Sequence, residues 1–471
     1  MKTIRGVIME NYLDRQYISP NDREIIGTND SKSIQNAVDT AKETGVNQVI
    51  IPHINARTKQ SVWIIDETVL LPDDITVILD NCTLKMADGV MCNLFRNSNF
   101  YGENANLLSG EQKNIFIHGI GNAVLDGGTY NGLSERNSLK NGLPHISNNT
   151  MLFFHNIRNF EVTGLRIKNH RWWAMTYLFA RDGKISDIDF RADLTAKDDN
   201  GSRLEGKVAK GYEELLIKNT DGIDLRVGCN NITIENITGI TGDDTIALTA
   251  LIGKHFEKNM LVSKRDTDIH SVIIRNVKSN PHGCANVRLL NHDGNKLYNI
   301  IIETIIDTSD ETSGYQPGAT IRIGEKHYIS ERPVCHGETY GITVRNVLSR
   351  ARTAVCMSAT CMNSYFNNIQ MFGDGETAIG TLNGGEFENL LFDGISFSPN
   401  RTCSEPFGYV CDLLNSTGKN VVFQNIFAEK IKSPARVSGG ICVEFASLRT
   451  GESKTEKAEC DALSKVSIVS K

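Results

Sequence analysis

Two acidic motifs in the sequence could supply acid–base chemistry. Asp221 lies in Asn219-Thr-Asp-Gly222, and Asp243 and Asp244 follow with an offset of 22 residues from Asp221 to Asp243. If the chain repeats with about that period, the three carboxylates fall on neighbouring repeats of one face. Carboxylates so close repel one another, which raises at least one pKa and keeps a proton bound near neutral pH. Such a group can protonate a leaving oxygen while an ionised partner activates water.

The carboxylates need a scaffold that repeats, and the sequence contains one. Short segments begin with Asn, Ser or Gly, alternate apolar and polar residues, and mostly end with Asn or Gly, as in 114–119, 159–164, 231–236, 271–276, 299–303, 341–346, 389–394 and 420–425. Alternation with period two predicts strands with one buried face. Asp-Gly and Gly-Asp-Asp are also common turn sequences. Their offset of one repeat favours the catalytic interpretation.

The repeat pattern predicts an all-β chain folded as a parallel β-helix. The segments recur about every 22 to 30 residues where no insertion intervenes, which suits one coil of such a fold. An antiparallel sandwich is the alternative, but two-residue hairpin links are not the rule here. We therefore expect one domain over 1–471, with coils at about 110–430. The long runs 192–213, 249–268 and 310–335 are predicted to be loops.

A different pattern precedes the repeats. Residues 33–42 read as an amphipathic helix with Ile34, Ala37, Val38 and Ala41 on one face. A helix within about 20–50 would cover the open end of the strand stack. We therefore predict an N-terminal capping helix.

The composition argues against several classes of protein. A net charge of -6, from 50 basic and 56 acidic residues, is opposite to the basic excess of nucleic-acid-binding proteins. The sequence lacks a signal-peptide apolar run and a membrane-spanning segment, so we expect a cytoplasmic protein without membrane or nucleic-acid partners. Eleven scattered cysteines predict reduced, mostly buried thiols. We expect neither a metal site nor a cofactor.

The motifs resemble those of the polygalacturonases, glycoside hydrolase family 28, within the pectate-lyase-like β-helix superfamily. The resemblance lies in Asn219-Thr-Asp, Gly242-Asp-Asp244 and His282-Gly283, and extends over roughly residues 110–350. It implies a right-handed parallel β-helix and single-displacement hydrolysis with inversion. It also implies that Asp243 is the general acid, while Asp221 and Asp244 hold and activate the water. His282 joins them as a candidate catalytic residue.

The resemblance also points to residues that would contact substrate. Asn219 belongs to the first motif, and Arg322 matches the Arg of an Arg-Ile-Lys triplet that grips a uronate in the family. Gly324 stands where that Lys belongs, which removes one of two cationic contacts. Our hypothesis is that Lys326, Arg288 or His327 substitutes for it. Trp173, or its neighbour Trp172, is a candidate for stacking on a sugar.

Together these features predict a glycoside hydrolase with an oligosaccharide or polysaccharide substrate. The expected substrate is a galacturonide or related pectic oligosaccharide, cleaved by inverting acid–base hydrolysis, with exo action. Two alternatives remain open. One is a polysaccharide lyase or epimerase on the same fold, and the other is a non-catalytic carbohydrate-binding β-helix.

Overall fold

The structure, a computed structural model, describes residues 15–128, 146–148, 150–170, 173–193, 195–197, 203–208, 221–252, 260–309, 316–328, 330–373, 375–398, 406–451 and 457–469. The chain divides into two compact units. The N-terminal unit comprises Met1–Asp224 and Glu257–Asp266, and the C-terminal unit comprises Leu225–Phe256 and Thr267–Lys471. The boundary falls within strand β13 (Asp221–Arg226).

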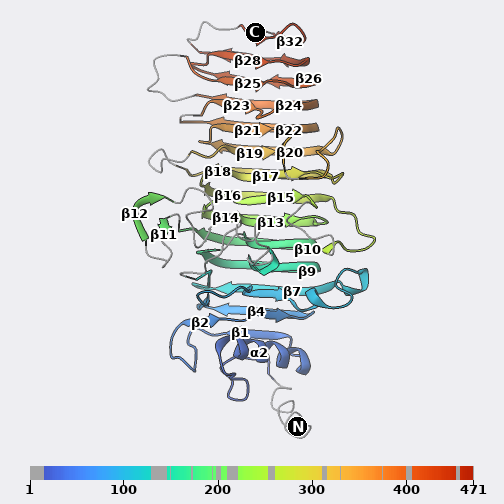
Figure 1. The fold of residues 1–471 in the computed structure, drawn as a ribbon. Coiled ribbons are helices and arrows are strands. Elements are labelled where there is room, and N and C mark those ends of the chain that lie inside the picture. Colours follow the sequence, from blue (N-terminus) through green and yellow to red (C-terminus); the bar gives the residue numbers. More distant parts are fainter. Residues whose placement is uncertain are drawn as a thin grey trace. The chain divides into compact units, whose positions relative to one another are not determined.

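In the described part of the N-terminal unit, parallel strands form a stack with an α-helix at its first end (Figure 1). Its elements are α2 (Asp30–Thr44), β1 (Gln48–Ile51), β2 (Val62–Ile65), β3 (Val69–Leu71), β4 (Ile75–Asp80), β5 (Thr83–Met86), β6 (Phe95–Asn97), η1 (Ser98–Tyr101), η2 (Leu108–Gly110), β7 (Gln112–Ile120), β8 (Val124–Asp126), η3 (Ile146–Asn148), β9 (Thr150–Lys168), β10 (Trp173–Arg191), β11 (Thr195–Lys197) and β12 (Arg203–Val208). Its core contains a column of apolar residues in register on successive strands: Val49, Val77, Ile117, Val162 and Ile185.

The C-terminal unit is also built from short parallel strands. Its strands are β14 (Asn230–Thr241), β15 (Ile246–Ala250), β16 (Ile269–Pro281), β17 (Ala285–Asn291), β18 (Leu297–Asp307), β19 (Ala319–Ile323), β20 (Thr339–Ser349), β21 (Thr353–Met357), β22 (Ala359–Met371), β23 (Thr377–Gly380), β24 (Gly385–Phe397), β25 (Tyr409–Leu413), β26 (Thr417–Gln424), β27 (Ile426–Ala428), β28 (Ser433–Val437), β29 (Ile441–Phe445), β30 (Leu448–Thr450), β31 (Glu459–Cys460) and β32 (Lys465–Ile468). Most pair with the strand of the next coil, as β14 with β16 and β16 with β18.

A column of phenylalanines fills part of the C-terminal core. Phe366, Phe392, Phe423 and Phe445 occupy one register on β22, β24, β26 and β29. Their rings stack with centroids 4.6, 4.5 and 4.9 Å apart, and each side chain is buried. Each such ring removes a large apolar surface from water, which stabilises the fold by about 1.5–3 kcal/mol.

The predicted parallel β-helix is confirmed, with one local difference. Among the described residues of each unit, the registered strand pairs are parallel except for β11 with β12, which are antiparallel. This hairpin lies within 192–213, a run predicted to be loop. The sequence of β12, Arg-Leu-Glu-Gly-Lys-Val, has a glycine where alternation requires an apolar residue, so the pattern did not mark it as a strand.

Asparagines make corners of the coils. Asn389 adopts a left-handed backbone with φ 54°, and its side-chain amide donates to Asn363 Oδ1 at 2.9 Å. Asn420, at φ 55°, donates in turn to Asn389 Oδ1 at 2.9 Å. Asn tolerates this conformation because its short side chain can bond locally. The corner is therefore repeated from coil to coil by side chains that hydrogen-bond one another.

The capping helix is also confirmed and is longer than predicted. Helix α2 begins after Asn29, whose Oδ1 accepts from Lys32 N, and ends at Gly45 with φ 74°. The predicted apolar face, Ile34, Ala37, Val38 and Ala41, is fully buried. The helix lies across the β1 end of the N-terminal stack (Figure 1).

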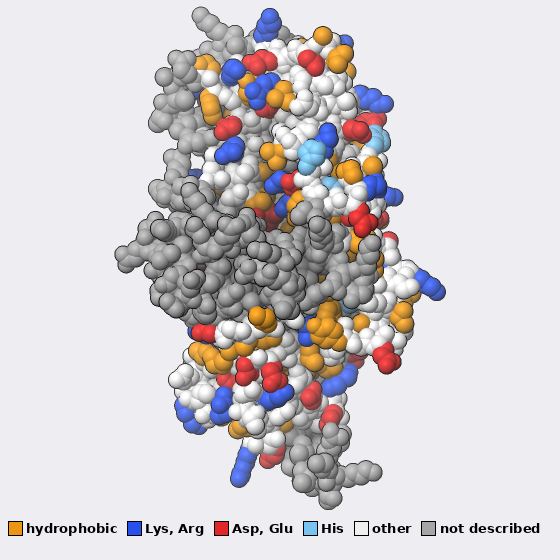
Figure 2. Space-filling view, in the orientation of Figure 1, with side chains coloured by type: hydrophobic (Ala, Val, Ile, Leu, Met, Phe, Trp, Pro, Cys, Tyr) orange, Lys and Arg blue, Asp and Glu red, His pale blue; other side chains and the backbone are white. Residues whose placement is uncertain are grey.

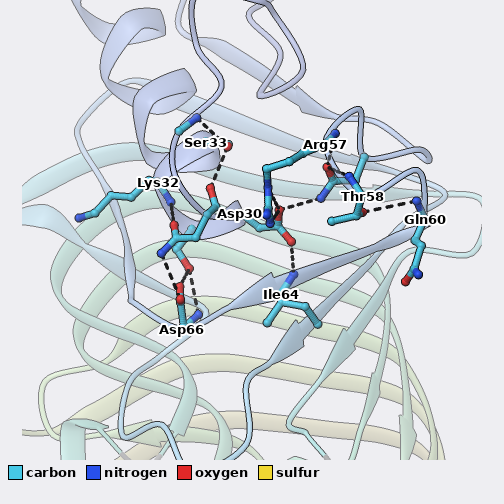
Figure 3. Close-up of polar contacts among 12 residues, drawn as sticks. Asp30, Lys32, Ser33, Arg57, Thr58, Gln60, Ile64 and Asp66 are labelled. Carbon is cyan, nitrogen blue, oxygen red and sulfur yellow. Dashed lines mark hydrogen bonds and ion pairs between the residues drawn. The ribbon is translucent and has the colours of Figure 1, made fainter.

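A buried carboxylate ties this helix to the strands. Asp30 is 1% exposed and accepts hydrogen bonds from Asn55 Nδ2 at 2.8 Å and Ile64 N at 2.8 Å. Arg57 adds Nε at 3.2 Å and Nη2 at 2.5 Å, as Figure 3 shows. One residue on, Ser31 Oγ donates to Asp66 Oδ1 at 2.6 Å. The first turn of the helix is thus fastened to strand β2 and its flanking loops.

The surface carries charges of both signs. On the face shown in Figure 2, acidic and basic side chains of the described residues are intermixed rather than gathered into a patch of one sign. No helix among the described residues is long and apolar enough to cross a membrane. The electrostatic features of interest are therefore local clusters.

Candidate active site

Asp243 and Asp244 lie in the turn between β14 and β15 of the C-terminal unit. Thr241, the last residue of β14, fixes this turn because its Oγ1 donates to the Asp243 carbonyl oxygen at 2.8 Å. Asp244 is 1% exposed, and its Oδ1 accepts from Ala285 N of the next coil at 3.1 Å. Asp243 is half-buried. The turn therefore holds one carboxylate inside the wall and its neighbour closer to solvent.

The environment of Asp244 favours retention of a proton. Burial raises the pKa of Asp244, and the charge of Asp243 raises it further. Arg288 Nη1, 3.3 Å from Asp244 Oδ2, acts in the opposite direction, as do Cys284 and Arg322.

Cys284 is a member of this cluster that the sequence prediction missed. One potential metal-ligand atom from each of Asp243, Asp244 and Cys284 lies within 4.8 Å of the other two. Burial and the two carboxylates raise the pKa of Cys284 well above its ordinary value, so the thiol stays protonated. These three atoms are close enough together to hold a metal ion, and the Arg288 guanidinium already contacts Asp244. The only sequence signal was the position of Cys284 two residues after His282.

Two arginines occupy adjacent coils next to the aspartates. Arg288 on β17 is in register with Arg322 on β19. Glu325 connects them, because its Oε2 lies 2.6 Å from Arg288 Nη2 and 3.0 Å from Arg322 Nη2. The structure thus brings together the predicted residues Arg288 and Arg322 and adds Glu325. Lys326 is exposed at the turn that follows.

The glycine at position 324 is required by the backbone. Gly324 has φ 74°, and a Cβ placed there would lie 2.0 Å from the Ser358 carbonyl oxygen. A lysine is therefore excluded at this position unless the turn moves. This explains why the Lys of the family triplet is absent here, and the same turn carries Glu325 to the arginines.

His282 follows the end of β16 on the coil after Thr241. Its backbone N–H donates to the Thr241 carbonyl oxygen at 3.0 Å, and its side chain is 9% exposed. Burial lowers the pKa of His282, so the imidazole is neutral near neutral pH. Pro281, which replaces the Gly of the family motif, pairs in register with Thr241 and completes β16.

The remaining predicted residues belong to the N-terminal unit or lie outside the described residues. Asp221 begins β13 and is 9% exposed, and Trp173 begins β10 and is 6% exposed. Asn219 and Trp172 lie outside the described residues. The roles assigned to these four residues stay predictions.

A pocket adjoins the arginine pair. It has a volume of about 440 Å³ and is lined by Lys326, His327, Tyr328, Ser330 and Pro333. The Tyr328 ring lies 5.3 Å from the Arg288 guanidinium carbon, which is within the range of a cation–π contact. The volume falls in the range of about 300–1,000 Å³ that is typical of small-molecule sites.

Comparisons with known proteins agree with the motif resemblance. Residues 64–267 match the family model of glycosyl hydrolases family 28. The match confirms the predicted resemblance to this family over that part of the chain, which includes Asp221, Asp243 and Asp244. A comparison with curated proteins found no significant match.

Solved structures share the fold at low sequence identity. A hyperthermoactive exopolygalacturonase from Thermotoga maritima matches with a TM-score of 0.50 and 13% identity, covering 95% of this chain and 96% of that chain. A mutant tailspike protein of Escherichia coli bacteriophage HK620, in complex with a pentasaccharide, matches with a TM-score of 0.61 and 12% identity, covering 97% and 81%. At such identities the likeness establishes the fold alone.

Proposed function

We propose that this protein is a glycoside hydrolase that cleaves galacturonide or related pectic oligosaccharides by acid–base hydrolysis with inversion. The observation that carries the proposal is the Asp243–Asp244 turn, where a buried carboxyl of raised pKa adjoins a second carboxyl and Arg288. The match to family 28 over residues 64–267 supports the same reaction. The saccharide named with the tailspike structure is consistent with a sugar ligand on this fold.

The difference in burial between the two aspartates suggests how their roles differ. Asp244 is buried in the wall, where the Ala285 amide and the Arg288 guanidinium hold it in place. Asp243 is less buried than Asp244 and therefore nearer to solvent. Because Asp243 is the more accessible of the two to a substrate, we assign it the role of general acid that the resemblance implies.

In the proposed reaction, Asp243 donates its proton to the glycosidic oxygen as that bond breaks. Water attacks the anomeric carbon from the opposite face and loses a proton to an ionised carboxylate, the role that the resemblance implies for Asp244 and for Asp221. The neutral His282 would donate a hydrogen bond rather than carry charge. We also propose exo action, by analogy with the exopolygalacturonase from T. maritima that shares the fold.

The test is hydrolysis of a panel of oligogalacturonides, rhamnogalacturonides and neutral oligosaccharides. We expect new reducing ends, a first-formed product of inverted anomeric configuration by NMR, and release of one small product from the chain end. Asp243→Asn should abolish all three signals. An unsaturated product that absorbs in the ultraviolet would instead identify a lyase. Unchanged sugars throughout the panel would favour a binding protein and contradict the proposal.

A further inference from the structure

The contact between Glu325 and the two arginines has a consequence for substrate choice. Arg288 and Arg322 are direct neighbours on adjacent strands, and like charges in that position repel. A carboxylate must lie between them for the pair to be stable. Glu325 supplies it from within the chain, at 2.6 Å from one guanidinium and 3.0 Å from the other.

The cluster is largely shielded from water. The side chains of Arg288, Arg322 and Glu325 are 14%, 19% and 20% exposed. Tyr328 covers part of Arg288 through the cation–π contact. Charge-assisted contacts with so little solvent are stronger than exposed ion pairs, so Glu325 is not readily displaced.

A substrate carboxylate would meet unfavourable charge here. The two guanidinium groups already contact two carboxylates, Glu325 and Asp244, and Asp243 lies next to the latter. A uronate would have to displace Glu325 from both arginines, and it would add a further negative charge beside these acids. A sugar whose C6 carries a hydroxyl group escapes both costs.

We propose that Glu325 is a specificity-determining residue that selects an uncharged sugar at the position beside Asp244. The proposal rests on the hydrolase function proposed above and narrows its substrate to pectic or related oligosaccharides with a neutral residue at that position. Glu325 acts as a built-in substitute for the carboxylate of a uronate. Removal of its charge frees two guanidinium groups for an anionic sugar.

The first test compares two substrates that differ only at C6. These are 4-nitrophenyl α-D-galactopyranoside and the corresponding galactopyranosiduronic acid. We expect the wild-type protein to have the higher kcat/KM for the neutral glycoside. Glu325→Gln should shift the ratio toward the uronide by about tenfold or more, because it exposes charge-assisted donors. Glu325→Asp keeps the charge and should retain the wild-type preference.

The second test measures binding without turnover. D-Galacturonate and D-galactose are titrated against each variant and followed by NMR, with thermal unfolding as the check on folding. Glu325→Gln should bind galacturonate about tenfold more tightly than wild type, with little change for galactose. Glu235→Gln is the matched control, because Glu235 also pairs with an arginine, Arg275 at 2.6 Å, but on strands β14 and β16 away from the cluster.

The outcomes separate this inference from the hydrolase proposal. If binding switches with Glu325→Gln but no variant cleaves either glycoside, the charge selection holds and the hydrolase proposal fails. If cleavage occurs and the preference is the same in wild type and Glu325→Gln, the charge selection is wrong. It is also wrong if Glu325→Gln binds galacturonate no better than the wild type does. A wild-type preference for the uronide that disappears in Lys326→Ala would contradict it as well.

Discussion

Asp30 in the N-terminal unit and Asp244 in the C-terminal unit are both 1% exposed, yet their surroundings differ. Asp30 accepts from Asn55, Arg57 and the Ile64 amide, with both oxygens engaged at 2.5–3.2 Å. Asp244 has one amide at 3.1 Å, one guanidinium at 3.3 Å and a second acid beside it. A carboxylate surrounded by donors fixes structure, whereas one that shares its site with another acid can exchange a proton.

The largest expected effect is on catalysis. Asp244→Asn removes a carboxylate that the proposed reaction needs, so kcat on the best substrate should fall about a thousandfold. Asp30→Asn, with the same atoms exchanged, should leave kcat of the folded protein unchanged. Initial rates under saturating substrate measure both. Equal losses in the two variants would remove the distinction between the two sites.

For stability we expect the reverse order, with a larger loss for Asp30→Asn than for Asp244→Asn. Asp30→Asn places an amide NH2 opposite donors from Asn55, Arg57 and Ile64, and we expect the free energy of unfolding to fall by about 3 kcal/mol. Chemical denaturation of the full chain measures this. Asp244→Asn serves as the comparison and should lose much less. A stability loss for Asp244→Asn that matched or exceeded the loss for Asp30→Asn would make Asp244 a structural residue.

A smaller loss is expected when the partner of Asp30 is removed. Arg57 is 39% exposed at its side chain, and Asp30 keeps Asn55 and the Ile64 amide without it. Arg57→Ala should therefore lower the free energy of unfolding by about 1–2 kcal/mol, less than Asp30→Asn. Denaturation of the two variants side by side tests the order. An equal or larger loss for Arg57→Ala would mean that the arginine, rather than the full set of donors, supports Asp30.

The smallest effect concerns pH. The folded protein raises the pKa of Asp244 above its ordinary value of 3.8, so this group stabilises the fold at low pH. That contribution is lost as the pH rises through the raised pKa. The melting temperature of Asp244→Asn, taken relative to that of the wild type, should therefore be higher at pH 7 than at pH 4. Melting temperatures at the two pH values measure it, and the opposite trend would contradict the raised pKa.

Local pattern was enough to predict the scaffold. Alternation in segments such as 231–236 and 389–394 places strands correctly, because a strand with one buried face repeats every two residues. Asn389 and its counterparts marked the corners, because few other residues tolerate a positive φ. The helix predicted over 33–42 extends to Asp30–Thr44, since its N-cap and C-cap lie outside the apolar pattern.

The site was predictable only where it depends on coil spacing. Motifs pointed to Asp243, Asp244 and Arg322, and Arg288 was one of three candidates to replace the missing lysine, but the contact of Glu325 with the arginines depends on the left-handed turn at Gly324. That turn brings Glu325 back to an arginine 37 residues earlier in the chain. Cys284 was missed for a similar reason, because its approach to the aspartates follows from the pairing of two coils. Contacts of this kind are set by tertiary geometry, which a local pattern does not encode.

The phenylalanine column implies an order of melting. Phe392 and Phe423 each have a ring above and a ring below, whereas Phe445 stacks on Phe423 alone within this column. In a solenoid, each winding is held mainly by the windings it touches, and beyond Phe445 only the half-buried Ile468 of β32 follows in register, so this end of the column has the least support. On heating or mechanical pulling, this column should therefore unfold first at its Phe445 end. Backbone amides near Phe445 should exchange with deuterium sooner than those near Phe392.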